Sequence, residues 1–206
     1  MEYFGNLSHI IDKYIDISKL INGIRDELIL DESKRIIGDE QSDMLFEAGY
    51  VGFKWIGINY FPNVHFSKEL IYELDNVFKT KVIAAWINEI PVGKVFPPHR
   101  DHDPRFVKIK KLGKLVTYNI HIGDPSFGHV FFIDNKVNYM QNHGDCYKWT
   151  PNQLHSAGNV GFKPKFNLIY NGVELFEPID INYRWDFIDE TLGDCKEYCI
   201  NWDYEL

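Results

Sequence analysis

The stretch LVTYNIHI, residues 115–122, shows the clearest alternation of apolar and polar residues in the chain. One side of an extended strand would carry Val116, Tyr118, Ile120 and Ile122. The other side would carry Leu115, Thr117, Asn119 and His121. Because successive side chains of a strand point to opposite faces, one face can pack on an apolar core while the other stays polar. With strands on both sides of it, this stretch predicts a barrel with a wet interior.

Further strands are predicted on both sides, because short β-branched or aromatic runs alternate with turns rich in Gly, Pro, Asn and Asp. The predicted strands are residues 53–60, 82–90, 130–133, 137–140, 146–149 and 166–170. Many short strands at close spacing are typical of an antiparallel barrel or sandwich. We therefore expect a mainly β protein whose core occupies residues 82–173.

Two helices are predicted ahead of this core. Apolar residues share one helical face between residues 9 and 30, and again between residues 67 and 80. Ser67 could cap the second helix, and Glu69 lies in its first turn. We expect residues 1–81 to support the core from the outside as part of the same domain. The acidic, aromatic tail, residues 174–206, is expected to cover the barrel.

The composition fits one globular domain. The chain has 206 residues, of which 45% are hydrophobic and 16% aromatic, and its net charge of −8 disfavours a nucleic-acid partner. No signal peptide and no apolar run long enough to cross a bilayer is found, so no membrane partner is expected. Three sparse cysteines indicate a reducing, cytoplasmic setting. The oligomeric state does not follow from the sequence.

The segment GKVFPPHRDHD, residues 93–103, concentrates metal-ligand chemistry where a strand is expected to end. His99 and Asp101 are two positions apart, so on an extended chain their side chains point to the same side. Pro97 and Pro98 favour an extended backbone. An imidazole and a carboxylate could therefore bind one metal ion. A second histidine would complete the two-histidine, one-carboxylate face of Fe(II) sites.

Two later histidines compete for that third position. A His-x-Asp triplet arises by chance in a chain of this size, and a second one, His143-Gly144-Asp145, has the composition of a turn. His155 lies 56 positions after His99, which leaves room for strands to cross the barrel and return to the same end. The predicted metal ligands are therefore His99, Asp101 and His155.

A basic residue follows ten positions after His155. Lys165, Asn167 and Ile169 alternate to one side of a predicted strand, which could put an ammonium group deep in the pocket beside an amide. That pair suits a small carboxylate. A buried lysine without an anion is costly, so a bound dianion would explain one that faces inward.

Together these residues resemble the pattern of the Fe(II)- and 2-oxoglutarate-dependent oxygenases. The pattern consists of Asn88, Gly93, His99, Asp101, His155, Lys165 and Asn167. The resemblance covers residues 82–173 and implies a double-stranded β-helix, which is a cupin-like jelly roll, with the N-terminal helices packed outside. It also implies that the three predicted ligands bind Fe(II), and that Lys165 and Asn167 hold the far carboxylate of 2-oxoglutarate.

Three segments look similar to the aspartyl/asparaginyl β-hydroxylase branch of that family, namely PPHRD, IHIGDP and WTPNQLHSAGNVG. In this branch a histidine on a comparable strand helps to hold the cosubstrate, which implies that role for His121, with Asn119 on the same face. The branch lacks the acidic ligand, so Asp101 is a departure toward the ordinary triad. Arginine is the commoner anchor at the position of Lys165, and Asn167 stands where serine or threonine is usual. The alternative anchors are Arg100, Arg105 and Lys163.

The resemblance implies an oxygenase that uses O2 and 2-oxoglutarate to hydroxylate a small molecule or an amino-acid or peptidyl side chain. Two other classes stay open, a cupin-like metal enzyme that does not use 2-oxoglutarate and a non-enzymatic jelly-roll binding module. A nucleic-acid dealkylating oxygenase is disfavoured, because that branch expects a basic residue where this chain has Asn171. His102 and Asp103 are expected at the mouth of the site or in a solvated loop. Trp86 and Tyr118 are expected in the core.

Overall fold

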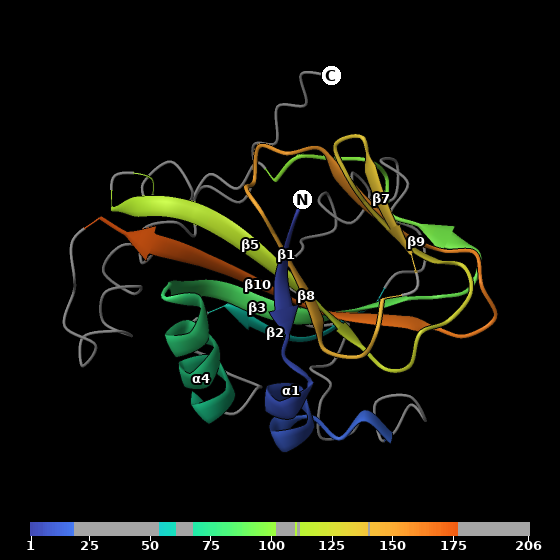
Figure 1. The fold of residues 1–206 in the computed structure, drawn as a ribbon, viewed down its shortest axis with the longest axis horizontal. Coiled ribbons are helices and arrows are strands. Elements are labelled where there is room, and N and C mark those ends of the chain that lie inside the picture. Colours follow the sequence, from blue (N-terminus) through green and yellow to red (C-terminus); the bar gives the residue numbers. More distant parts are fainter. Residues whose placement is uncertain (19–53, 61–67, 102–109, 111, 140, 177–206) are drawn as a thin grey trace, which may run out of the picture.

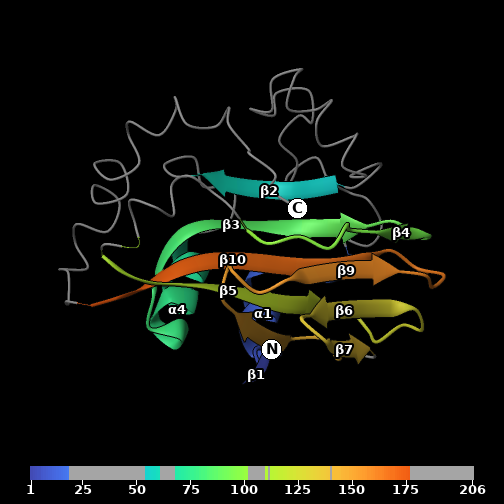
Figure 2. The ribbon, with the colours of Figure 1, turned by 90° about the horizontal axis from the view of Figure 1, so that it is seen from above.

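The computed structural model shows a mainly β protein and describes residues 1–18, 54–60, 68–101, 110, 112–139 and 141–176. Its strands form two sheets (Figures 1 and 2). The six-stranded sheet has the order β1 (Glu2–Asn6), β8 (Asp145–Trp149), β5 (Gly113–Ile122), β10 (Lys165–Leu175), β3 (Lys81–Ile90) and β2 (Lys54–Tyr60). The four-stranded sheet has the order β4 (Lys94–Val95), β9 (His155–Asn159), β6 (His129–Ile133) and β7 (Lys136–Tyr139).

The chain alternates between the two sheets as it runs from β3 to β10. Strands β3, β5, β8 and β10 lie in the larger sheet, and β4, β6, β7 and β9 lie in the smaller one. All of their pairings are antiparallel. This connectivity is that of a double-stranded β-helix, or jelly roll. The predicted fold class is therefore confirmed, and β1 and β2 extend the larger sheet at its two edges.

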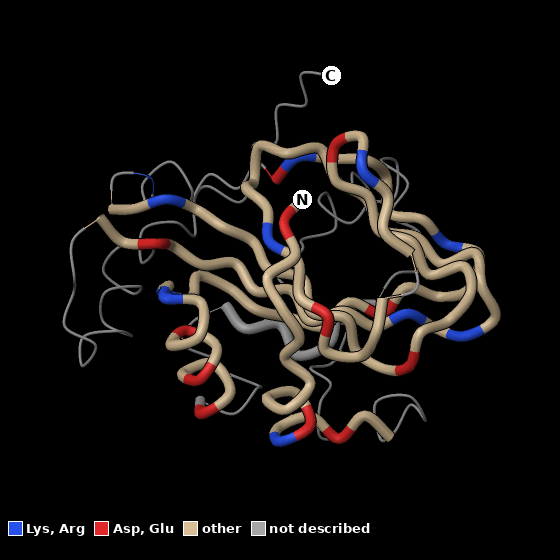
Figure 3. Tube along the Cα trace, in the orientation of Figure 1, with Lys and Arg blue, Asp and Glu red and all other residues tan. Residues whose placement is uncertain are grey.

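The jelly roll runs from Lys81 to Leu175. The division into a support region, a core and a cover segment stays a prediction, and residues 177–206 of the tail lie outside the described residues. Lysine and arginine residues are scattered along the described trace rather than gathered in one stripe (Figure 3). None of the helices described is long and apolar enough to cross a membrane.

Two helices, α1 (Ser8–Tyr14) and α4 (Lys68–Phe78), cover the outer face of the larger sheet (Figure 1). Their buried apolar residues are Ile10, Ile11, Leu70, Ile71, Leu74 and Phe78. These residues share one apolar cluster with Tyr118, Ile120 and Ile122 of β5, and Phe78 stacks on Tyr118 with ring centroids 3.7 Å apart. Helices on the outside and Tyr118 in the core are thus both confirmed.

The first helix is shorter than the sequence predicts. A continuous helix from residue 9 to residue 30 is wrong, because the backbone at Ile15 is extended, with φ −119° and ψ 115°. Ile15 is buried in the core cluster, and its amide donates to the carbonyl oxygen of Ile11, which closes the helix. Residues 19–30 lie outside the described residues. The helix predicted over residues 67–80 corresponds to α4.

The inner face of β5 is polar, as its alternation predicts. Thr117, Asn119 and His121 are buried on the side of the strand opposite the helices. Apolar residues from both sheets fill the rest of the space between them, namely Ile90, Phe96, Phe131, Ile133, Trp149, Ala157 and Ile169. The interior therefore combines amide, hydroxyl and imidazole groups with an apolar wall.

Three strands depart from the sequence prediction. β1 pairs with the edge of β8, although its residues carry no clear alternation. β9 begins at His155 and is absent from the predicted strands, because turn residues precede it in the sequence. β10 extends five residues beyond the predicted end at residue 170, because β3 pairs with it on one side and β5 on the other.

Candidate metal centre

Backbone hydrogen bonds bring the two halves of the predicted triad together. The amide of His99 donates to the carbonyl oxygen of His155, and the amide of His155 donates to that of His99, both at 2.9 Å. The amide of Asp101 donates to the carbonyl oxygen of Pro151 at 3.0 Å. The segment that follows β4 therefore lies along the start of β9, and the three side chains meet.

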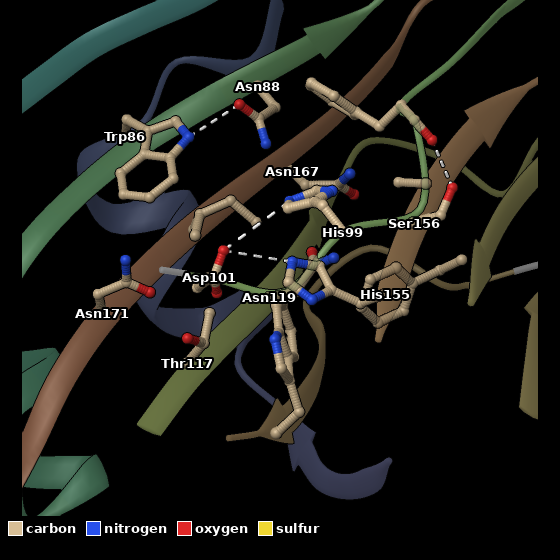
Figure 4. A pocket seen from close by; sticks show the side chains of 15 residues that line it. Trp86, Asn88, His99, Asp101, Thr117, Asn119, His155, Ser156, Asn167 and Asn171 are labelled. Carbon is tan, nitrogen blue, oxygen red and sulfur yellow. Dashed lines mark hydrogen bonds and ion pairs between the residues drawn. The ribbon is translucent and has the colours of Figure 1, made fainter. Parts of the chain in front are cut away.

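The ligand atoms of the triad face one another (Figure 4). Nε2 of His155 lies 3.5 Å from Oδ1 of Asp101, and Nε2 of His99 lies 3.8 Å from the same oxygen. One ligand atom from each residue lies within 4.8 Å of the other two. Adjacent ligands about 2.1 Å from an octahedral ion are about 3 Å apart, so each of the two nitrogen–oxygen distances exceeds that spacing by less than about 1 Å.

Each histidine is oriented by a hydrogen bond on the far side of its ring. Nδ1 of His99 donates to the carbonyl oxygen of Pro97 at 2.8 Å, and Nδ1 of His155 donates to that of Gln153 at 3.0 Å. Because a carbonyl oxygen only accepts, these bonds leave both Nε2 lone pairs facing Asp101. Burial lowers the pKa of both imidazoles, which favours the neutral form that binds metals.

A cavity of about 100 Å3 opens beside the triad. Its polar wall consists of Asn88, Thr117, Asn119, Ser156, Asn167 and Asn171. Its apolar wall consists of Trp86, Phe96, Phe131, Trp149, Ala157 and Ile169. Within the part of the chain that the structure describes, no lysine, arginine or glutamate side chain lines this cavity, and Asp101 is its only carboxylate.

Lys165 is completely buried, two positions before Asn167 on β10. Its Nζ donates to the carbonyl oxygen of Val130 at 2.7 Å and lies 5.9 Å from the ring centroid of Phe131. Among the described residues, no carboxylate forms an ion pair with it. Burial alone lowers the pKa of Lys165 to about 7. The cost of burying the ammonium group without a counter-charge is therefore the cause of this lowered pKa.

Two buried histidines accompany Lys165. Nδ1 of His121 donates to Oδ1 of Asn167 at 3.3 Å, and burial, followed by the charge of Lys165, lowers the pKa of His121 to about 4. The ring of His129, on β6, lies 5.8 Å from that of His121, and its Nε2 donates to the carbonyl oxygen of Lys163 at 3.0 Å. Sequence reasoning did not find His129, because a lone histidine after a glycine turn carries no local signal.

The structure gathers the predicted residues around one strip of the interior. Those that line the cavity are His99, Asp101, Asn119, His155 and Asn167. Lys165 precedes Asn167 on the same face of β10, and His121 lies opposite Asn167 on β5. The roles of these residues in holding a metal ion and a cosubstrate stay predictions.

The second His-x-Asp triplet leads from a turn into β8, whose first residue is Asp145. The amide of Gly123 donates to Nδ1 of His143 at 3.1 Å, so Nε2 carries the proton and donates to Oδ1 of Asp12 at 3.0 Å. Asp145 accepts a hydrogen bond from the amide of Asn142 at 2.8 Å. Both side chains therefore stabilise the turn, as predicted.

Other expected residues fall in different places. Trp86, expected in the core, packs against the apolar cluster between the sheets and also lines the cavity, where its Nε1 donates to Oδ1 of Asn88 at 2.8 Å. Two alternative anchors, Arg100 and Lys163, are exposed, and Arg100 donates to the carbonyl oxygen of Asn152. The residues that lie outside the described part of the chain are His102, Asp103 and Arg105.

A scan against protein-family models and a search of curated proteins find no match. A predicted oxalate decarboxylase from Thermotoga maritima is 15% identical at a TM-score of 0.37, covering 59% of this chain and 84% of that chain. An oxidoreductase of the 2OG-Fe(II) oxygenase family from Burkholderia pseudomallei is 13% identical at a TM-score of 0.38, covering 52% and 53%. A cupin 2 conserved barrel domain protein from Salinispora arenicola is 10% identical at 0.31, covering 43% and 60%. Because these TM-scores are low, the jelly-roll assignment rests on the strand order of the two sheets.

Proposed function

We propose that this protein is an Fe(II)- and 2-oxoglutarate-dependent oxygenase that hydroxylates an amino-acid or peptidyl side chain. One observation carries the proposal: Lys165 is buried without an anionic partner among the described residues, on the strand that also lines the cavity of the His/Asp/His cluster. A metal site alone would fit many enzymes. A metal site beside an unpaired buried cation fits a reaction that needs both a metal ion and a dianionic cosubstrate.

The triad holds the metal ion. His99, Asp101 and His155 bind through one atom each, which leaves the remaining positions of the ion for the cosubstrate and O2. The hydrogen bonds on the two Nδ1 atoms keep both rings in the orientation that binding needs.

Lys165 holds the far carboxylate of 2-oxoglutarate. Asn167 assists, because its Oδ1 accepts from His121 and its Nδ2 is buried without a hydrogen-bond partner among the described residues. The oriented amide can therefore donate to the same carboxylate. A dianion supplies the negative charge that the burial of Lys165 lacks. Asn119 lies on the same inner face, in the next row of β5.

When bound, Fe(II), 2-oxoglutarate and O2 supply oxidising chemistry, in which 2-oxoglutarate gives succinate and CO2 while an oxygen atom enters a C–H bond of the substrate. The protein itself places the reactants and excludes water. Phe131, Trp149 and Ile169 form a dry side of the cavity. The ring of Trp149 packs against His155 at a centroid distance of 5.2 Å and so restricts that ligand.

Absorption spectroscopy and product analysis test the proposal. Anaerobic addition of Fe(II) and 2-oxoglutarate to the full chain should give a weak visible charge-transfer band, and aerobic incubation should give succinate. Asp101→Ala removes the only carboxylate ligand and should abolish both signals. His143→Ala is a matched control in a turn outside the cavity and should keep both. A protein that binds Fe(II) but never shows the band would refute the proposal.

The same measurements separate the other classes. Metal binding without succinate would indicate a cupin-like metal enzyme that does not use 2-oxoglutarate. Partner binding that survives His155→Ala unchanged would indicate a binding module. Succinate release across free amino acids, peptides and other small molecules tests both the substrate class and the likeness to the β-hydroxylase branch. Salt-sensitive binding of single-stranded DNA would contradict the expected absence of a nucleic-acid partner.

A further inference from the structure

Three side chains from neighbouring strands form a polar row across the larger sheet. Asn171 of β10 lies opposite Thr117 of β5, and Thr117 lies opposite Trp149 of β8. Residues directly opposite each other have Cβ atoms about 5 Å apart, so the three side chains are neighbours. All three line the same cavity as Asp101, and Figure 4 labels Asn171, Thr117 and Asp101 in its wall.

Each member of the row has a buried polar atom without a hydrogen-bond partner in the described part of the chain. The atoms are Oδ1 of Asn171, Oγ1 of Thr117 and Nε1 of Trp149. The three residues are only 8%, 1% and 4% exposed. Buried polar atoms in folded proteins are nearly always paired, so three unpaired atoms in one row point to a bound group. Oδ1 of Asn88, elsewhere in the cavity wall, is by contrast paired with Trp86.

The row lies apart from the proposed cosubstrate position. Asn171 follows Lys165 by six residues on β10, and at about 3.3 Å per residue their Cα atoms are about 20 Å apart. Trp149 instead packs against the metal ligand His155. A molecule bound to the row would therefore lie beside the metal ligands without displacing 2-oxoglutarate from Lys165.

The chemistry of the three atoms limits what the row can bind. Oδ1 of Asn171 only accepts hydrogen bonds, Nε1 of Trp149 only donates, and the hydroxyl of Thr117 does either. A neutral amide carries N–H donors and a carbonyl acceptor side by side, so it satisfies all three. A carboxylate has no donor for Oδ1 of Asn171, and an ammonium has no acceptor for Nε1 of Trp149. Outside the triad, none of the described residues that line the cavity is charged to compensate for an ion.

We propose that Asn171, Thr117 and Trp149 bind a neutral amide group of the primary substrate, beside the metal ligands. That this amide belongs to a substrate rests on the proposed oxygenase function. Amide binding requires no turnover, so it can be measured separately from that function.

Nuclear magnetic resonance of the full chain labelled with 15N tests the proposal with butyramide as the probe. The indole N–H resonance of Trp149, assigned with Trp149→Phe, should shift and saturate as butyramide is added. 2-Pentanone keeps the carbonyl but has no N–H group, and butyrate carries a charge instead. Each should bind about ten-fold more weakly, the loss expected for one or two hydrogen bonds. Equal affinity for the three compounds would overturn the proposal.

Two variants locate the binding. Thr117→Val and Asn171→Leu keep the approximate shape of each side chain and remove its polar atoms, so each should weaken butyramide binding about ten-fold. Asn138→Leu, on β7 outside the cavity, is the matched control and should keep the affinity of the unaltered chain. The spectra themselves show whether the variants are folded. Undiminished butyramide binding in both cavity variants would rule the row out.

Failure of this inference and failure of the proposed function give different results. Succinate formation together with equal binding of butyramide and 2-pentanone would exclude the amide row and keep the oxygenase. Selective butyramide binding without succinate under any condition would keep the row and exclude the oxygenase.

Discussion

Replacing Lys165 with methionine should stabilise the protein in the absence of cosubstrate. The ammonium group is completely buried, and burial lowers its pKa from 10.5 to about 7. At pH 7 this lowering corresponds to about 4 kcal/mol of destabilisation of the folded state. Methionine has a similar length and no charge, but it leaves the carbonyl oxygen of Val130 without its hydrogen bond, which costs about 1 kcal/mol. The net gain in the free energy of unfolding is therefore about 2 to 3 kcal/mol.

Thermal denaturation followed by circular dichroism measures the effect. For a domain of this size the gain corresponds to a rise in Tm of about 5 to 10 °C. Lys136→Met is a matched control, because Lys136 is exposed on β7 and its replacement should change stability by less than about 0.5 kcal/mol. Addition of 2-oxoglutarate should raise the Tm of the native protein and leave that of Lys165→Met unchanged.

The advantage of the methionine variant should shrink as the pH rises from 7 toward 10.5. In this window the unfolded chain, in which Lys165 has its ordinary pKa, binds more protons than the folded chain. The native protein therefore gains stability with rising pH, whereas the variant lacks this contribution. A lower Tm for Lys165→Met at pH 7, or an equal advantage at pH 10, would refute the reasoning that charge burial is the dominant cost.

Other perturbations test the cosubstrate anchor and the fold. The affinity for 2-oxoglutarate should fall about ten-fold per pH unit above pH 7, because the free protein then loses the Lys165 proton. The side chain in Lys165→Arg stays charged, so calorimetric titrations of this variant should show no such fall with pH. A fall of the same size in the variant would contradict the assignment of Lys165 as the cosubstrate anchor. Chemical denaturation should show that Gly144→Ala lowers the free energy of unfolding by about 2 kcal/mol more than Gly93→Ala does. Both glycines have positive φ, but of the two only Gly144 is placed so that an added Cβ would overlap backbone atoms, those of Ser8. Equal losses of stability in the two variants would argue against this contact. Cys146 should resist alkylation until the protein unfolds, because burial raises the pKa of its thiol; site-resolved mass spectrometry that found native modification would count against it.

Features that depend on local periodicity could be predicted from the sequence. The alternation in β5 places Tyr118 under the helices and Asn119 in the interior, because a strand has only two faces. The closeness of the His99 and Asp101 side chains was equally predictable, since the two residues share one side of an extended segment. Lys165 was expected to face inward on chemical grounds, and it is completely buried.

Features that depend on pairing between distant segments could not be predicted in the same way. No local pattern shows that Thr117 lies between Asn171 and Trp149, because strand register is decided by contacts between strands far apart in the chain. The cavity contact of Trp86 was missed for a related reason, since an aromatic residue on an inward face can pack on the core and also line a cavity, as Trp86 does. The early end of α1 at Tyr14 depends on the burial of the next residue, which helix periodicity does not report.

Mutual backbone hydrogen bonds at 2.9 Å join His99 and His155, although the two residues lie 56 positions apart in the chain. The conformational entropy lost in gathering these two side chains is therefore part of the cost of folding, and a metal ion bound as proposed would not have to offset it. At the proposed metal site, a chelator would then remove an ion, and a new ion would enter, without unfolding of the chain. The metal content of the protein would then follow the supply of ions around it, while its fold persists through each exchange.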